Sequence, residues 1–359
     1  ALYVSETLPS ILRKAGYKTI HVGKAHWGAI GTPGEDPLNL GFDVNIAGHA
    51  AGGPGSYYGK NNFSAAFRNG GPEWDVPGLE KYHGKDINLT EALTLEATHE
   101  MEKAVDEKRP FYLYMSHYAI HAPWEEDNRF VEKYKQMGLT DFEAVYASML
   151  ESMDKSLGDL MQHVRRLGIE KNTIIIFMSD NGQPHQVKTY PPLRGHKITP
   201  YEGGIRVPML VKVPGMTKPG SECNVPVIIE DIYPTILSLA SATKFAENME
   251  IVDGRDISPL LQGKKSMDKN RAFFWHYPHI YDVTPYSIIR KGDWKLIWHY
   301  ADQRAELFNL KYDIGEKNNL ADKEPDKAQA LRKELREYLE SVNAPIPRKK
   351  STNEPFRLP

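Results

Sequence analysis

The segment Asn172–Gly182 reads NTIIIFMSDNG: an apolar, β-branched run that ends in serine, aspartate, asparagine and glycine. A short unbroken apolar run is typical of a strand that is buried on both faces of a parallel sheet. Aspartate, asparagine and glycine are ordinary turn residues, so this ending alone indicates only a turn. Two other predicted strands of the chain also lead into polar clusters, and this repetition points to more than turn formation.

Each predicted strand follows a helix whose apolar residues recur at helical spacing. The pairs are residues 7–16 with 19–22, 93–104 with 110–116, and 140–168 with 173–178; a fourth strand at 207–213 leads toward a helix around 232–240. Alternating helices and apolar strands predict an α/β domain with a mostly parallel sheet sandwiched by helices.

The polar clusters GKAHWG (23–28), HYAIHAPW (117–124) and SDNG (179–182) come directly after three of these strands. Ligands of parallel α/β sheets bind beyond the carboxyl ends of the strands. We therefore expect the three clusters to meet in one site at that edge of the sheet.

After about Gly254 the pattern changes to short strands joined by tight turns, with Gly292-Asp293 as a hairpin signal and a charged helix from about Pro325 to Val342. We predict a main α/β domain over residues 1–253, a small C-terminal antiparallel sheet plus helix over 254–343, and an extended tail over 344–359. The glycine-rich loop AAGGPGSYYG (50–59) has no phosphate-loop lysine, so we do not interpret it as nucleotide-binding.

Composition excludes several classes of function. Lys+Arg 45 against Asp+Glu 47 gives a net charge of -2, which argues against a surface built for nucleic acid or anionic membranes. No apolar run reaches membrane-spanning length, and the single cysteine, Cys223, excludes an internal disulfide. The sequence opens at Ala1 without an initiator methionine or signal pattern, so we expect the natural N-terminus to be missing.

Asp180 and Asn181 offer hard oxygen ligands of the kind that Ca²⁺ or Mg²⁺ prefers, although two ligands do not complete a site. Groups that carry positive charge or donate protons, suited to binding an oxyanion, are Lys24, His26, His121, Arg194 and Lys197. By spacing alone each signal is weak, because strand-end aspartate and asparagine usually serve turns and loop lysines and histidines are usually solvated.

The segment LRGHKITPYEGGIRVPM (193–209) resembles the sulfatase family, which has a similar Leu-Arg-Gly-x-Lys stretch running into Tyr-Glu-Gly-Gly-x-Arg-x-Pro. AGYKTIHVGKAHWG (15–28), FYLYMSHYAIHAPW (111–124) and IIIFMSDNG (174–182) match further blocks of that family in the same order. The segments GDWKLI (292–297) and ELFNLKYDIGEKNNLA (306–321) are similar to its terminal subdomain. Bacterial arylsulfatase A-like enzymes, with an alkaline phosphatase-like fold, are the nearest resemblance.

The resemblance implies a role for each matching residue. Lys24 and His26 would surround the catalytic nucleophile, with His26 helping to expel sulfate from the covalent intermediate. His121 would be the acid for the leaving alcohol, and Lys197 would bind the sulfate. Asp180 and Asn181 would be two of the Ca²⁺ ligands.

The chain departs from the family at the nucleophile, which is a formylglycine made from a Cys/Ser-x-Pro/Ala-x-Arg motif before the Gly-Lys-x-His block. Only the first helix precedes that block here, and Cys223 lacks the following arginine. The paired aspartates that complete the family's Ca²⁺ site are absent together with the first strand. We interpret the chain as a sulfatase without its N-terminal segment and predict negligible turnover by this polypeptide.

Further substrate-binding candidates are Arg194, His185 and His196 at the rim of the pocket, and His276, for which core or interface packing is the alternative. The resemblance implies a sulfated carbohydrate or an aryl sulfate as substrate, and we favour carbohydrate because Tyr, Trp and His are frequent in the candidate loops. It also implies export, whereas the oligomeric state stays open. Two rival interpretations are a phosphate or phosphonate ester hydrolase of the same superfamily and a non-catalytic protein that binds sulfated glycans.

Overall fold

The computed structural model describes residues 6–187, 192–247, 252–264, 268 and 270–359. Its contacts divide the chain into two compact units. The first unit comprises residues 1–173 and 229–259, and the second comprises 174–228 and 260–359. This grouping joins residues 174–228 to the C-terminal region, whereas the sequence-based domain prediction kept them in the main domain. Each unit is described by itself below.

The first unit contains a parallel sheet in the order β2-β1-β3, formed by Val44–Ile46, Lys18–Gly23 and Phe111–Ser116. In this register Ile20 lies beside both Val44 and Leu113. Because side chains alternate along a strand, Ile20 and Val22 point to one face and Thr19 and His21 to the other. The parallel sheet predicted for this part of the chain is confirmed.

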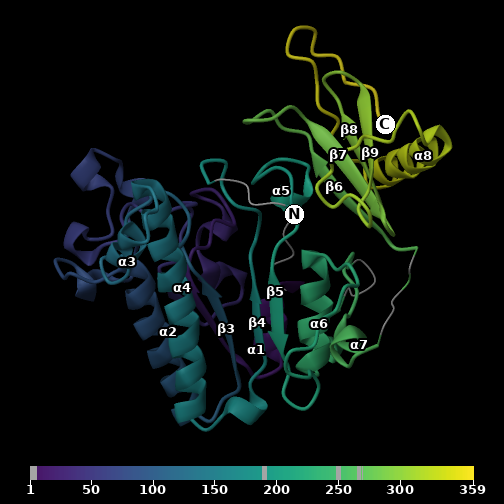
Figure 1. Cartoon of the computed structure of the whole chain (residues 1–359). Coiled ribbons are helices and arrows are strands. Elements are labelled where there is room, and N and C mark those ends of the chain that lie inside the picture. Colours follow the sequence, from purple (N-terminus) through teal and green to yellow (C-terminus); the bar gives the residue numbers. More distant parts are fainter. Residues whose placement is uncertain (1–5, 188–191, 248–251, 265–267, 269) are drawn as a thin grey trace. The chain divides into compact units, whose positions relative to one another are not determined.

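Helices cover both faces of this sheet. Helices α2 (Leu89–Asp106) and α4 (Asp141–Arg166) lie side by side, and α2 packs on β1 and β3 (Figure 1). Helix α1 (Leu8–Lys14) also packs on β1, and its buried Ile11 and Leu12 join Leu237 of α6 in a separate cluster. The remaining helices are α3 (Val131–Gln136), α6 (Ile232–Leu239) and α7 (Ser258–Leu261).

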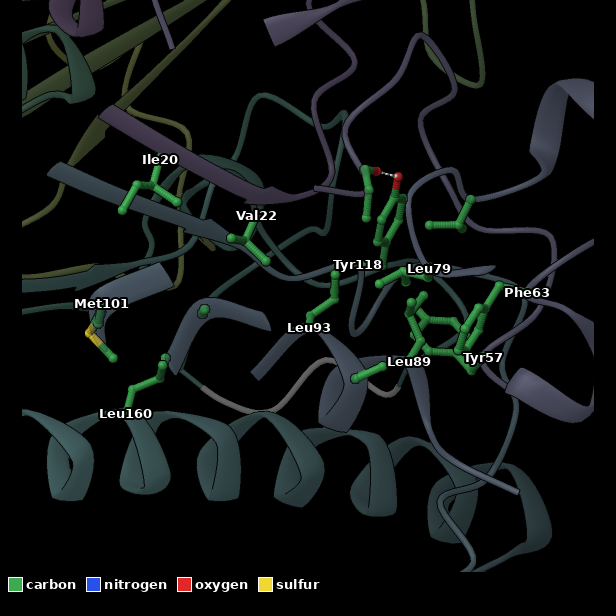
Figure 2. Close-up of a cluster of buried hydrophobic side chains, with 14 of the residues drawn as sticks. Ile20, Val22, Tyr57, Phe63, Leu79, Leu89, Leu93, Met101, Tyr118 and Leu160 are labelled. Carbon is green, nitrogen blue, oxygen red and sulfur yellow. Dashed lines mark hydrogen bonds between the residues drawn. The ribbon is translucent and has the colours of Figure 1, made fainter. Parts of the chain in front are cut away.

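The first unit's main core fills the space between the sheet and α2 and α4. Figure 2 shows Ile20 and Val22 of β1 above Leu93 of α2 and Leu160 of α4. The Tyr118 hydroxyl donates to the Ala47 carbonyl over 2.7 Å, so this buried phenol is satisfied (Figure 2). The core therefore holds the loops that follow β1 and β3 on a rigid base.

Local signals account for the ends of these helices. Thr140 and Glu143 have the sequence spacing that predicts a capping box. In the structure the Thr140 hydroxyl accepts from the Glu143 N–H, and the Glu143 carboxylate accepts from the Thr140 N–H, so this prediction is confirmed. Short 3-10 helices span Pro33–Glu35, Pro37–Leu40, Gly59–Asn61, Ala66–Arg68, Pro72–Trp74, Glu80–Tyr82, Glu170–Asn172, Ile229–Asp231 and Thr243–Phe245.

In the second unit, β4 (Ile175–Met178) pairs antiparallel with β5 (Met209–Lys212), with Ile176 opposite Val211. The sequence predicted β4 and β5 as strands of one mostly parallel sheet, and for this pair the parallel direction is wrong. A parallel connection in such folds usually runs through a packed helix. The described part of the β4–β5 connection forms loops and the four-residue α5 (Glu202–Ile205) instead.

The rest of the second unit is an antiparallel sheet in the order β6-β7-β8-β9, backed by α8 (Pro325–Ser341) (Figure 1). Its strands are Ala272–Tyr277, Tyr286–Lys291, Trp294–His299 and Arg304–Asn309. Gly292, with φ 58°, and Asp293 form the two-residue turn between β7 and β8 that the sequence predicted. Leu331, Leu335 and Leu339 of α8 pack on the sheet, and Phe356 and Leu358 of the tail pack against the same cluster. The predicted antiparallel sheet plus helix is confirmed.

Within the described residues, no helix combines the length and apolar character needed to cross a membrane.

Candidate active site

The predicted site residues occur in both units. Lys24, His26 and His121 belong to the first unit, and we call them the histidine cluster. Those in the second unit are Asp180, Asn181, His185, Arg194, His196, Lys197 and His276. We use the name lysine loop for residues 192–204.

The turn that carries Lys24 and His26 is fixed against the ends of β1 and β3. The Lys24 N–H donates to the carbonyl of Ser116, the last residue of β3, over 2.8 Å. Gly23 has a φ of 105°, and a Cβ on it would lie 1.9 Å from the same Ser116 carbonyl oxygen. Only glycine fits there, since any other residue meets both an unfavourable φ and a clash. Close backbone contact with β3 thus fixes the position of the turn that carries Lys24 and His26.

His21 of β1 contacts this turn through its buried ring, a role that was not predicted from the sequence. Its ring is fully buried, with Nε2 3.2 Å from the Lys24 carbonyl oxygen and Nδ1 3.1 Å from Asn45 Oδ1. Burial lowers the pKa of His21 to about 4, so the ring is neutral near pH 7. A neutral imidazole donates one hydrogen bond, and here two acceptors face it. The signal for such a role was a histidine in the middle of an apolar strand.

His121 lies in the loop after β3 and is held at several atoms. Its Nδ1 lies 2.8 Å from the Ala122 carbonyl oxygen, which sets the orientation of the ring. Its N–H donates to the Tyr118 carbonyl, and its own carbonyl accepts from the Tyr57 hydroxyl over 2.8 Å. Since Nδ1 faces the backbone, Nε2 is the ring atom on the opposite side of the imidazole.

Two consecutive glycines bring His26 and His121 together. A Cβ on Gly52 would lie 2.7 Å from His26 Cε1, and one on Gly53 would lie 3.0 Å from His121 Nδ1. Adjacent Cα atoms are about 3.8 Å apart, so the two rings contact neighbouring points of one short segment. The loops that leave the parallel neighbours β1 and β3 therefore do meet. These glycines lie in the glycine-rich loop to which the sequence analysis gave no role.

In the second unit, glycine packing joins the Asp180-Asn181 turn to the lysine loop. The Gly182 N–H donates to the Gly204 carbonyl over 3.0 Å, and a Cβ on Gly182 would lie 1.9 Å from the Gly203 carbonyl oxygen. The Lys197 N–H donates to the Gln183 carbonyl over 2.8 Å. The backbone thus places Lys197 next to the turn that carries the two predicted metal ligands.

The other predicted substrate-binding residues differ in their surroundings. The rings of His185 and His196 lie 5.7 Å apart beside Lys197, and His196 Nδ1 is 2.9 Å from the Lys197 carbonyl oxygen. Arg194 stacks on Tyr201 and donates to the Glu316 carbonyl over 2.9 Å.

His276 has protein partners at both ring nitrogens: Ser287 Oγ and the Pro345 carbonyl oxygen, each at 2.8 Å. These bonds tie β6 to β7 and to the tail. A substrate contact by His276 stays a prediction, as does one by Arg194.

A buried ion cluster anchors the end of the lysine loop. Lys295 Nζ lies 3.0 Å from Glu202 Oε1 and 2.8 Å from Glu316 Oε1, and all three side chains are buried. Glu316 also accepts from the Glu202 N–H over 2.7 Å. Burial raises the pKa of Glu202, but Lys295 and Arg290 outweigh it and hold that pKa below its ordinary value. Burial raises the pKa of Glu316, which Lys295 offsets only in part.

Asp180 and Asn181 were also assessed as a metal site. A carboxylate and an amide oxygen suit Ca²⁺, which takes six to eight oxygen ligands. Across the described residues, however, no group of three or more His, Cys, Asp or Glu side chains is arranged to hold a metal ion. The chemistry of the two ligands fits the ion, and their number falls short of a complete site.

The segment Ser64-Ala-Ala-Phe-Arg68 has the spacing of the formylglycine motif, although it follows the Gly-Lys-x-His block, and it escaped the sequence analysis. The Ser64 side chain is buried, and its hydroxyl accepts from the Ala66 N–H over 3.0 Å at the start of a 3-10 helix. Turn formation accounts for this serine. Cys223, by contrast, is exposed and lacks the motif's arginine.

Comparison with known proteins gives the class. The sulfatase family profile matches residues 3–242, and a profile described as N-sulphoglucosamine sulphohydrolase, C-terminal, matches residues 196–345. The chain therefore belongs to the sulfatase family, a family of sulfuric ester hydrolases.

Individual relatives agree with this assignment. A sulfatase of Formosa agariphila is 29% identical over 93% of this chain and 70% of its own length, and arylsulfatase J of Mus musculus is 31% identical over 83% and 48%. The crystal structure of Ps i-CgsB in complex with k-i-k-neocarrahexaose is 26% identical, with a TM-score of 0.78 over 94% of this chain and 74% of that chain. The fold class predicted from the sequence is confirmed. The chain spans about half of the mouse protein and about three quarters of the solved structure.

Proposed function

We propose that this protein is a sulfuric ester hydrolase that removes sulfate from a sulfated carbohydrate. The observation that carries the proposal is the family match, together with the presence of Lys24, His26, His121 and Lys197 on the family's motifs. The carbohydrate part is supported by the similar structure of Ps i-CgsB, which was solved with a neocarrahexaose.

Each cluster supplies a distinct part of the chemistry. In the first unit, the ammonium group of Lys24 would neutralise charge on a sulfate oxygen, and in the second unit Lys197 offers a group of the same chemistry; the negative charge of the sulfate is what distinguishes the substrate. His121, held through Nδ1, gives a proton from Nε2 to the leaving alcohol oxygen. His26, in the same unit as His121, would assist the release of sulfate, as the family resemblance implies. Asp180 and Asn181 would hold Ca²⁺, which when bound supplies further positive charge to the sulfate oxygens.

We expect negligible release of 4-nitrophenol from 4-nitrophenyl sulfate by this 359-residue polypeptide. Intact-mass and peptide mass spectrometry will show whether any cysteine or serine carries the formylglycine modification. Appreciable turnover, or formylglycine at Ser64 or Cys223, would contradict the predicted loss of the nucleophile.

Ligand binding tests the proposed function without requiring turnover. Isothermal titration with a sulfated neocarrageenan oligosaccharide should give measurable affinity, which the desulfated oligosaccharide should lack. Lys197→Ala and Lys24→Ala should each weaken the affinity at least about 10-fold, the effect of losing one charge-assisted contact. Lys212→Ala, a substitution in β5, is the matched control.

Equal binding of sulfated and desulfated oligosaccharides would refute the proposal. Tighter binding of 4-nitrophenyl phosphate than of 4-nitrophenyl sulfate would favour the phosphoester hydrolase instead.

A further inference from the structure

We propose that Gly52–Tyr57 is a positioning element that sets the separation and orientation of His26 and His121. We call this segment the glycine clamp. Its catalytic meaning rests on the proposed function, whereas its effect on the two rings is a property of the first unit alone. The clamp lies within AAGGPGSYYG, a motif that the assigned chemistry leaves without a role.

The need for glycine in the clamp comes from the two rings. Neither Gly52 nor Gly53 has a positive φ, so their backbone conformations accept alanine. A Cβ on Gly52 would meet the His26 ring at 2.7 to 3.0 Å, and one on Gly53 would meet His121 Nδ1 and the Ala122 carbonyl oxygen, both at 3.0 Å. Such contacts are closer than carbon normally allows, so a methyl group would displace the ring or the clamp. The bare Cα atoms are therefore what let both imidazoles approach.

The far end of the clamp is tied to the loop that carries His121. The Tyr57 hydroxyl donates to the His121 carbonyl over 2.8 Å, and the Tyr57 ring is only 1% exposed. Glu125 Oε2 accepts from both the Tyr57 N–H, at 2.7 Å, and the Ser56 hydroxyl, at 2.8 Å. One carboxylate and one phenol thus hold the clamp and the His121 loop together at three points.

The near end is tied to the turn that carries His26. The His26 N–H donates to the carbonyl of His49 over 3.1 Å, three residues before Gly52. Gly55 packs so closely on Ser64 and Ala65 that a Cβ would lie 2.3 Å from the Ala65 nitrogen. The clamp from Gly53 to Tyr57 is buried, whereas His26 is exposed and His121 is partly exposed. A rigid, buried segment therefore carries two accessible imidazoles.

The experiment follows the imidazole resonances of the whole chain, labelled with ¹⁵N-histidine, with His26→Gln and His121→Gln as assignment variants. We expect Gly52→Ala to shift the ring resonances of His26 most, and Gly53→Ala and Tyr57→Phe to shift those of His121 most. Tyr57→Phe keeps the aromatic ring, so a change there reports the lost hydrogen bond.

Two controls separate positioning from general destabilisation. Tyr58→Phe removes a neighbouring hydroxyl that donates to the Glu126 carbonyl, a residue outside the histidine cluster. Gly158→Ala adds a methyl group in α4 where nothing lies within 4 Å. Both should leave the His26 and His121 resonances in place.

Shifts in the Gly52, Gly53 and Tyr57 variants that match those of the controls would overturn the proposal, as would equal shifts of both histidines in every variant. Because no ligand or turnover enters this measurement, failure of the sulfatase proposal leaves its outcome intact. Conversely, a chain that binds sulfated ligand with unchanged resonances in all clamp variants would refute the clamp alone.

Discussion

The two units hold their predicted site residues by different physical means. In the first unit, Lys24, His26 and His121 are placed mainly by backbone hydrogen bonds and by glycines that allow close approach, with one carboxylate, Glu125, beside the His121 loop. In the second unit, the end of the lysine loop is held by a buried ion cluster, in which Lys295 pairs with the carboxylates of Glu202 and Glu316. Neutral bonds make modest net contributions to stability, whereas a buried charge that loses its partner is costly. The comparison predicts different responses to acid and to substitution.

Acid should weaken the first unit before the second. Burial lowers the pKa values of His21 and His117 to about 4, below the ordinary value of 6.5. Between pH 6.5 and 4 these two histidines bind protons in the unfolded chain but stay neutral in the folded unit. The free energy of unfolding therefore falls as the pH falls through this range. Once the pH is below 4, each histidine has lowered the free energy of unfolding by about 3 kcal/mol.

In the second unit, burial raises the pKa of Glu306, but His299 and Arg304 outweigh this effect and hold it at about 2. Stability from this group is present above pH 4.5 and is lost only as the pH falls toward 2. Hydrogen exchange at pH 7 and pH 4.5 should show protection lost first in β1 and β3 and retained in β7 and β8. Loss of protection in β7 and β8 before β1 and β3 would contradict the expected difference between the two units.

Lys295→Met should destabilise the second unit by about 3 to 5 kcal/mol, since it leaves Glu202 and Glu316 buried without their cation. Lys291→Met is the matched control on the neighbouring strand. Lys291 pairs with Glu334 at 2.8 Å, but its side chain is 34% exposed, so its removal should cost at most about 1 kcal/mol. Urea denaturation followed by tryptophan fluorescence measures both variants. Similar losses in the free energy of unfolding for the two variants would show that the buried cluster stabilises the unit no more than an exposed ion pair does.

A smaller difference is expected between two phenols. Tyr118→Phe removes a bond to the neutral Ala47 carbonyl and should cost about 1 kcal/mol. Tyr201→Phe removes a bond to the Glu306 carboxylate, at 2.9 Å, and should cost about 1.5 to 3 kcal/mol because the acceptor is charged. Urea midpoints for the two variants give the comparison directly. A larger loss for Tyr118→Phe would contradict the view that charge dominates in the second unit.

Elements with strong local signals were predictable from the sequence. The Thr140 capping box and the Gly292-Asp293 hairpin depend on residues a few positions apart, and both were found as predicted. The antiparallel pairing of β4 with β5 was not predictable in this way, because it depends on contacts between strands that are far apart in the sequence. The fold as a whole came from apolar periodicity, which tertiary packing did not override.

Residues of the candidate site were predictable only where they belong to a recognisable sequence motif. His26 and His121 came from such motifs, whereas the support from Gly52, Gly53 and His21 came into view only once three-dimensional neighbours were known. The same holds for the pair of Glu202 and Lys295, which lie 93 positions apart in the chain. Their only sequence signal was a lysine inside the apolar strand WKLIW, which by itself names no partner.

The interleaved glycines of the lysine loop have a consequence for engineering. A Cβ on Gly203 or Gly204 would lie within 2.6 Å of neighbouring carbonyl oxygens, as a Cβ on Gly182 would. Backbone oxygens cannot swing aside as a side chain can, so saturation libraries should find these three codons nearly invariant. Substitutions at His185 and His196 are expected to be tolerated more readily, because they change side chains without forcing two stretches of main chain apart.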